Sequence, residues 1–265
     1  MSLKNLLLPV ALSMAMLLAG ITTKAQVADY TFAQTSGAYT SISGGTVVAT
    51  ATSTNSLDNA IYNVPSGTIP FTFLFNGTGY TGLNISTNGF ITFGTTAPSS
   101  SNYTPISNSA TYEGAISAFA GDLNTMYNVG TPPVTGEIRY EIVGTAPNRE
   151  FVVQWSNFRP SYTTSTTNAY AFDFQIRLQE NGNKIVIVYG GALDYLVGSA
   201  TYSSTRQIGL RGVSNTDYNN RTNSTSTAFT SSSAGTSNSA TQAFNTTATP
   251  PRKQANKSSF LMQRV

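Results

Sequence analysis

The chain has 265 residues and contains no histidine and no cysteine, which excludes a Ser-His-Asp relay, a cysteine nucleophile, a disulfide and an ordinary zinc site. Its 14 basic residues outnumber its 11 acidic ones, but the excess lies near the two ends. Between Gln26 and Ala248 there are 8 basic and 11 acidic residues, so this part lacks the basic surface that binding to nucleic acid requires.

The first 25 residues have the pattern of a cleavable signal peptide. Lys4 supplies a positive start, an apolar run follows from Leu6 to Gly20, and Thr23 and Ala25 are small residues at the −3 and −1 positions of a cleavage site. The apolar run is short for a membrane span of about 20 residues. We therefore expect an exported protein that is extracellular, on the cell surface or periplasmic, with no membrane insertion after cleavage.

Four segments of the mature chain alternate apolar and polar residues with a period of two. This pattern is typical of β-strands with one face on a core, because apolar residues at every second position would spread around a helix. The parity of Trp155, the single tryptophan, predicts that it packs in the core. The apolar positions are Phe71, Phe73 and Phe75; Ile138, Tyr140 and Ile142; Phe151, Val153 and Trp155; and Phe172, Phe174, Ile176 and Leu178.

Two Asn-Gly pairs mark tight connections between apolar runs. Asn181-Gly182 is the strongest short-range signal for a hairpin, because both residue types accept a positive φ. Asn88-Gly89 indicates a second tight turn or a bulge. Long polar connections interrupt the strand pattern over 95–113 and 124–135.

After Thr222 the composition changes to Ser, Thr, Asn and Ala, with Phe229 and Phe244 as the aromatic residues up to Thr249. A segment of this kind buries too little apolar surface to offset the entropy of ordering it. Phe229 is a candidate member of a last strand. We therefore expect a signal peptide over 1–25, one β-sandwich domain over 26–230 and a low-complexity linker with a basic tail over 231–265.

Many short strands, regular turns and the lack of a helical period predict an all-β fold. The expected architecture is an antiparallel β-sandwich of jelly-roll-like character with a flexible Ser/Thr-rich C-terminal tail. A mature chain of about 240 residues is long enough to bury ~70% of its unfolded surface without disulfides.

Two acidic positions are candidates for a calcium site built from side-chain and backbone oxygens. Asp122 ends an apolar segment close to Asn124, and Asp58-Asn59 precedes the apolar pair at Ile61. Asp and Asn are also typical turn residues, and neither position has the ligand density of a D-x-D-x-D-G loop. The sequence requires no cofactor. Asp58, Asn59, Asp122 and Asn124 either cap turns or bind calcium.

Tyrosines in polar loops are candidates for contact with a ligand, because a tyrosine ring offers a rigid amphipathic surface. Convergence of several of them at one end of the sandwich would form a contact patch, whereas scattered positions would not. The candidates are Tyr103, Tyr112, Tyr127, Tyr162, Tyr195 and Tyr202.

Paired carboxylates are the catalytic apparatus that remains, since glycoside hydrolysis needs two of them. Asp173 shares a strand face with Arg177, which predicts a surface ion pair, and Glu180 opens a hairpin turn. No acid/base pair is identifiable, so we expect no enzyme activity.

Two segments carry a resemblance to a known family. Ser86–Gly94 reads STNGFITFG and Ala115–Leu123 reads AISAFAGDL. Both resemble motifs of the nidogen-like (NIDO-like) extracellular module of secreted Bacteroidetes surface proteins, and the later strands follow in a similar order. The resemblance covers about Tyr62 to Tyr218. It implies an extracellular β-sandwich used in adhesion or surface assembly, with no catalytic residues.

These observations favour a non-catalytic exported module for recognition, adhesion or surface assembly, whose partner is an extracellular protein or a polysaccharide. The second interpretation is a carbohydrate-binding module, with or without stabilising calcium, and it predicts a row of exposed tyrosines. The third is a glycoside hydrolase with two carboxyl groups ~5–10 Å apart across a cleft.

Overall fold

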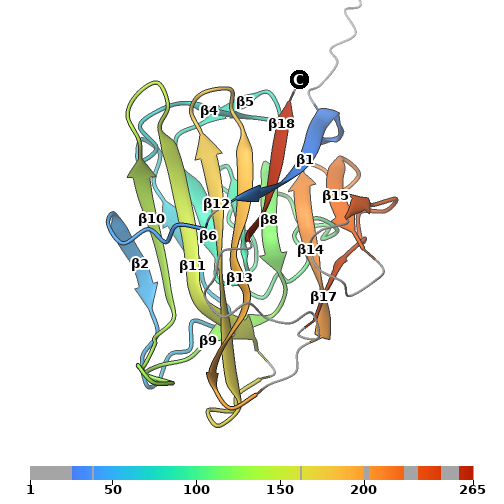
Figure 1. Ribbon diagram of the computed structural model, residues 1–265. Helices are drawn as coiled ribbons and strands as arrows, with labels where there is room; N and C mark the ends of the chain where they lie inside the picture. The colour runs from blue at the N-terminus through green and yellow to red at the C-terminus, as the bar shows by residue number, and fades with distance from the viewer. Residues whose placement is uncertain are drawn as a thin grey trace, which may run out of the picture.

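The computed structural model describes residues 26–37, 39–161, 163–199, 203–223, 232–245 and 257–264, with the backbone alone at 35–37, 191–194, 245 and 257–264 (Figure 1). Within these residues the regular elements are strands and one short 3₁₀ turn, η1 (Val27–Asp29). No helix in this part of the chain is long and apolar enough to cross a membrane. The expected signal peptide over 1–25 lies outside the described residues.

Two antiparallel sheets pack face to face, which confirms the predicted β-sandwich. The first sheet has the strand order β1-β18-β13-β12-β11-β10-β2, with β9 beside β11. Its strands are β1 (Tyr30–Gly37), β2 (Thr46–Thr50), β9 (Leu123–Thr125), β10 (Glu137–Val143), β11 (Glu150–Pro160), β12 (Ala169–Gln179), β13 (Ile185–Val197) and β18 (Lys257–Arg264).

The second sheet has the order β16-β15-β14-β8-β7-β6-β3, with β17 beside β14. Its strands are β3 (Ile61–Val64), β6 (Leu83–Ser86), β7 (Phe90–Phe93), β8 (Gly114–Ala120), β14 (Ser203–Arg211), β15 (Tyr218–Thr222), β16 (Ser233–Ala234) and β17 (Gln242–Asn245). A separate hairpin of β4 (Phe73–Phe75) and β5 (Thr78–Tyr80) lies at one end of the sandwich, and β9 lies at the other (Figure 1).

The apolar residues of each alternating run pack in or against the core, as the period of two predicted. Trp155 is fully buried and stacks on Phe174 with ring centroids 5.0 Å apart, so the predicted core position of the tryptophan is confirmed. Among the residues that the alternation predicted to face the core, the fully buried ones in these two strands are Phe151, Val153 and Trp155 of β11 and Phe174, Ile176 and Leu178 of β12.

Both Asn-Gly turns are present. The connection between β6 and β7 turns over Thr87, Asn88 and Gly89, and the φ of +83° at Gly89 is the left-handed conformation that glycine adopts without strain. The connection between β12 and β13 takes positive φ at Gly182 and Asn183, one residue later than the Asn181-Gly182 pair would give.

A β-bulge in β11 sets the direction of the residues that follow it. The register shifts between Trp155 and Phe158, and Asn157 has a φ of +59°. The extra residue changes the parity of the strand, so Phe158 is buried in the core. Arg159 then lies opposite Asn124 of β9, at the β9 end of the sandwich.

The bulge also explains why an expected ion pair is replaced. Asp173 accepts a hydrogen bond from the backbone N–H of Asn157 at 2.7 Å, so its carboxylate satisfies the bulged backbone. Arg177, which we expected to pair with Asp173, forms its salt bridge with Glu150 at 2.6 Å.

The outer face of the first sheet is covered by a strap, residues 39–45, that connects β1 at one edge to β2 at the other (Figure 1). Gln154 accepts from the backbone N–H of Ile42 at 2.9 Å, and Gln175 donates to the carbonyl of Thr40 at 2.9 Å. The two glutamines also bond to each other at 2.7 Å and are almost fully buried. The polar face of these strands is therefore also buried, and its side chains are hydrogen-bonded to the strap.

A second cover, the loop over 99–113, lies on the outer face of the second sheet. Gln207 of β14 accepts from the backbone N–H of Ile106 at 3.0 Å. Arg211 of the same strand donates to the carbonyls of Asn108 and Ala110 at 2.8 and 2.7 Å. The long connection that the sequence predicted over 95–113 is thus tied to the sheet by buried polar side chains.

The region after residue 230 differs from the expected linker and tail at the three strands that the structure describes there. β17 pairs with β14 and contributes buried Phe244 to the core, β16 pairs with β15, and β18 pairs with both β1 and β13. The composition of a segment indicates how much apolar surface it can bury. It does not show that β1 and β13 both offer backbone hydrogen-bonding groups to a strand between them. Phe229 lies outside the described residues.

Candidate functional site

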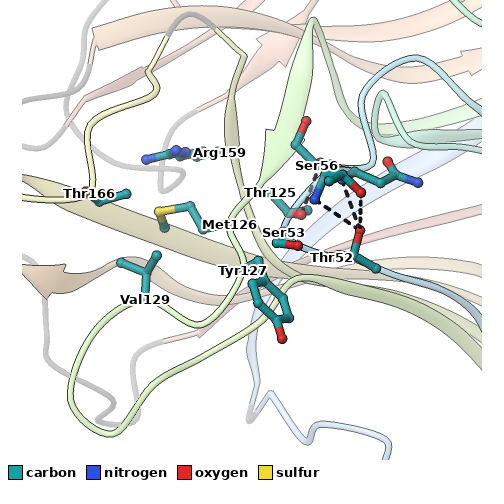
Figure 2. A pocket seen from close by; sticks show the side chains of 11 residues that line it. Thr52, Ser53, Ser56, Thr125, Met126, Tyr127, Val129, Arg159 and Thr166 are labelled. Atoms are coloured by element: carbon teal, nitrogen blue, oxygen red, sulfur yellow. Dashed lines mark hydrogen bonds between the residues drawn. The ribbon is translucent and has the colours of Figure 1, made fainter.

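A pocket with both polar and apolar walls opens at the β9 end of the sandwich (Figure 2). Its cavity volume is about 490 Å³, within the range of small-molecule sites. The walls come from the turn after β2, the segment that follows β9, the end of β11 and the β11–β12 connection. The lining residues are Thr52, Ser53, Thr54, Asn55, Ser56, Thr125, Met126, Tyr127, Val129, Arg159 and Thr166.

One wall is a tight turn over 52–55. The backbone groups of Thr52 and Asn55 bond to each other in both directions, and the Thr52 hydroxyl accepts from the N–H of Asn55 at 3.0 Å. The carbonyl of Ser56 then accepts from both the N–H and the hydroxyl of Thr125, at 2.8 and 3.1 Å. These bonds fix the turn to β9, so this wall is preorganised.

Hydroxyl groups line both that wall and the β11–β12 connection. Ser53, Ser56 and Thr166 have side-chain oxygens that make no hydrogen bond to the protein in the part of the chain that the structure describes. Hydroxyls donate and accept, so such a wall suits a ligand with many hydroxyl groups.

The segment after β9 supplies the apolar part of the site. Tyr127 is 50% exposed, while Met126 and Val129 are buried beside it. Backbone bonds between Val129 and Val134, and from Gly136 to the carbonyl of Met126, close this loop. Figure 2 shows Tyr127 between Met126 and Val129 on one side and the 52–56 turn on the other.

Arg159 brings the only charge among the lining residues. Its side chain is almost completely buried, at 4% exposure, and burial lowers the pKa of its guanidinium. Nε donates to Oδ1 of Asn124 at 3.4 Å and Nη1 donates to the carbonyl of Ser165 at 2.8 Å. No carboxylate forms a salt bridge with Arg159 in the described residues.

The predicted tyrosine patch is brought together only in small part. Tyr127 lines the pocket, and Tyr195 lies partly buried against the core. Tyr103 is half-buried in the 99–113 loop. Tyr112 is not a surface residue: it is 1% exposed, its ring lies 4.1 Å below the Arg211 guanidinium, and its hydroxyl donates to the carbonyl of Pro105. Tyr162 and Tyr202 lie outside the described residues.

The residues considered for calcium have mixed surroundings. Burial and, second, the charge of Asp122 raise the pKa of Asp58. Asn59 accepts from Nδ2 of Asn88 at 3.2 Å, and Oδ1 of Asn124 accepts from the cationic Arg159. No group of three or more carboxylate, histidine or cysteine side chains suited to a metal occurs in the described residues. Calcium at these positions stays a prediction.

Arg159 was not among the residues that the sequence singled out. Its burial in the pocket depends on the bulge at Asn157, and the local sequence Asn157-Phe158-Arg159 contains no glycine to mark it. The Ser/Thr run over 52–56 has the composition of an ordinary turn. Only the long-range pairing of β11 with β9 brings these segments together.

Comparison with known proteins places the chain in a family. A family model described as NIDO related matches residues 29–255, which is most of the chain, and it confirms the resemblance to nidogen-like modules. No curated protein and no solved structure matches the chain.

Proposed function

Since the chain belongs to the NIDO-related family, whose nidogen-like modules are extracellular and generally non-catalytic, we propose that it is an exported recognition module that binds saccharide units of an extracellular polysaccharide in the pocket. The observation that carries the proposal is the position of the half-exposed Tyr127 ring beside the hydroxyl-rich turn over 52–56.

Saccharides are recognised by two kinds of contact that this pocket offers. The apolar face of a sugar ring packs on an aromatic ring, and its hydroxyls exchange hydrogen bonds with side chains that both donate and accept. Tyr127 supplies the ring, and Ser53, Ser56 and Thr166 supply hydroxyls that the described protein leaves uncommitted. The lining contains no Asp or Glu, so the pocket itself holds no pair of carboxylates for glycoside hydrolysis.

Binding of soluble saccharides to residues 26–265 tests the proposal. A glycan array followed by calorimetry on the ligands found would compare the unsubstituted protein with Tyr127→Ala and Tyr127→Phe. We expect Tyr127→Ala to weaken binding roughly tenfold, because the stacking surface is lost, and Tyr127→Phe to retain most of the affinity. Leu74→Ala is the matched control, since Leu74 is 47% exposed in β4 at the opposite end of the sandwich.

Saccharide binding that Tyr127→Ala weakens and Leu74→Ala leaves unchanged would support the proposal. Absence of saccharide binding, or binding that is equally strong in Tyr127→Ala, would contradict it. In that case a protein partner captured on another face would be the better explanation of the recognition function.

A further inference from the structure

We propose that Arg159 makes this pocket selective for saccharides that carry a carboxylate, such as uronic acid residues. The inference rests on the proposed function and names its ligand class. Two observations lead to it: Arg159 lines the pocket although the residue is only 4% exposed, and no carboxylate of the described residues forms a salt bridge with it.

The guanidinium has hydrogen-bonding capacity that the described protein does not use. Of its five N–H groups, one on Nε bonds to Asn124 and one on Nη1 bonds to the carbonyl of Ser165. One N–H on Nη1 and both on Nη2 have no partner in the described part of the chain. Nη1 and Nη2 form one edge of the planar group, and this edge matches the two oxygens of a carboxylate.

Among the side chains that the structure describes, no acidic group compensates the charge of Arg159. Burial lowers the pKa of the guanidinium, yet arginine stays protonated at any physiological pH. Tyr170 is the titratable neighbour that affects its pKa, and a tyrosine hydroxyl is neutral at pH 7. An isolated cation in a protein wall is unfavourable, and a ligand anion would neutralise it. A monoanionic ligand group therefore gains more at this site than at an exposed arginine.

The rest of the lining favours a saccharide acid over a peptide carboxylate. Seven of the eleven lining residues are Ser, Thr or Asn, and Met126, Tyr127 and Val129 add apolar side chains. A peptide terminus brings one carboxylate and amide groups, whereas a uronic acid brings one carboxylate and several hydroxyls. The hydroxyl-rich turn over 52–56 complements the hydroxyls of the uronic acid.

Matched pairs of saccharides that differ only in the carboxylate test the inference. Calorimetry on residues 26–265 would compare oligogalacturonate with oligogalactose, and oligoglucuronate with oligoglucose. We expect the acidic member of at least one pair to bind roughly 10- to 100-fold more tightly than its neutral partner, because a charge-assisted pair is added. The preference should fall as the pH drops through the pKa of the uronate and as salt increases.

Three variants separate recognition from a structural role. Arg159→Gln should abolish the preference for the acidic saccharide and leave binding of the neutral one within a few fold. Arg159→Lys should retain only part of it, because an ammonium lacks the planar fork. Arg149→Gln is the control, since Arg149 directly precedes the same strand β11 at the other end and pairs with Glu180 at 2.7 Å. Circular dichroism and melting temperature would verify that each variant is folded.

Each result decides between the two proposals. Loss of the acidic preference in folded Arg159→Gln, with neutral binding kept, supports the inference. Equal affinity for acidic and neutral saccharides, or stronger binding of sulfated sugars or of peptide carboxylates, overturns it and leaves saccharide recognition itself to the Tyr127 test. Should Arg159→Gln not fold, an acidic preference that does not fall with pH and salt in the unsubstituted protein would overturn it equally.

Discussion

Trp155 of β11 donates a hydrogen bond from Nε1 to the main-chain oxygen of Ser86 in β6, at 2.9 Å, and so joins the two sheets through the core. Ser86 leads directly into the turn at Asn88, whose Oδ1 accepts from the N–H of Leu123 at 3.1 Å. Leu123 begins β9, and β9 carries Thr125 into the pocket wall. The core tryptophan therefore contributes to the position of the binding site.

Replacement of this tryptophan tests the link between the sheets. Trp155→Phe should lower the free energy of unfolding by about 2–3 kcal/mol, because it opens a small cavity and removes the shorter of two hydrogen bonds to the buried carbonyl of Ser86, which keeps the 3.3 Å bond from the N–H of Gly89. Urea denaturation would measure the change. Phe158→Leu, a loss of aromatic volume at a buried position of the same strand, is the control, and an equally large effect there would show that volume alone matters.

The strap over 39–45 should depend on Gln154. Its Oε1 accepts from Ile42 at 2.9 Å and from Gln175 at 2.7 Å, so Gln154→Leu leaves two buried donors without an acceptor. We expect a loss of about 2–3 kcal/mol in unfolding free energy, together with faster hydrogen exchange at the Ile42 amide. Gln179→Leu, at a half-buried position of β12, should change neither quantity much. Unchanged exchange at Ile42 in Gln154→Leu would show that the strap is held by other contacts.

Much of the fold could be predicted because period-two alternation is a local signal of which face meets a core. Trp155 and Phe174 are buried as their parity required, and Gly89 marks a turn through its positive φ. The bulge at Asn157 was not predictable, because it is stabilised by Asp173 from a neighbouring strand rather than by its own sequence. Every residue after the bulge, Arg159 included, therefore escaped the parity argument.

The candidate site could be predicted still less. Of the six tyrosines proposed, Tyr127 lines the pocket, whereas Tyr112 is buried under a guanidinium in a polar-looking loop. Sequence composition treats a loop rich in Ser and Asn as exposed. Composition gives no sign that Arg211 and Gln207 of β14 hold that loop against the sheet by hydrogen bonds.

Arg211 should be essential for keeping the 99–113 loop in place. It is 2% exposed and donates to the carbonyls of Pro105, Asn108, Ala110 and Val213. Lysine carries its donors on one atom and cannot span this set, so Arg211→Lys should lower the unfolding free energy by about 2–4 kcal/mol.

Limited proteolysis provides a second measurement for this prediction. The loop should be cleaved faster in Arg211→Lys than in the unsubstituted protein, because the carbonyls of the loop lose their guanidinium donors. Arg149→Lys, at a half-buried surface pair, should be cleaved at the original rate. Resistance of Arg211→Lys to cleavage would mean that packing of Tyr112, rather than the hydrogen bonds, holds the loop.

Asp58 should make the stability depend on pH. Burial and the nearby charge of Asp122 raise the pKa of Asp58 in the folded protein above its unfolded value, so the folded state binds this proton more tightly. The resulting stabilisation is complete below the unfolded pKa, which is near 3.9, and is lost as the pH rises through the folded pKa. Asp58→Asn should accordingly raise the melting temperature at about pH 7 and leave it unchanged at about pH 3.

The same experiment decides whether the two aspartates hold calcium. The Asp58→Asn gain should shrink in the Asp122→Asn background, because the repulsion that it relieves is already removed. Millimolar calcium should then shift neither melting curve if the pair acts only as two repelling charges. A rise in melting temperature of the unsubstituted protein with calcium, reversed by a chelator and absent in Asp58→Asn, would contradict this expectation, because a bound cation would turn the repulsion into a stabilising contact.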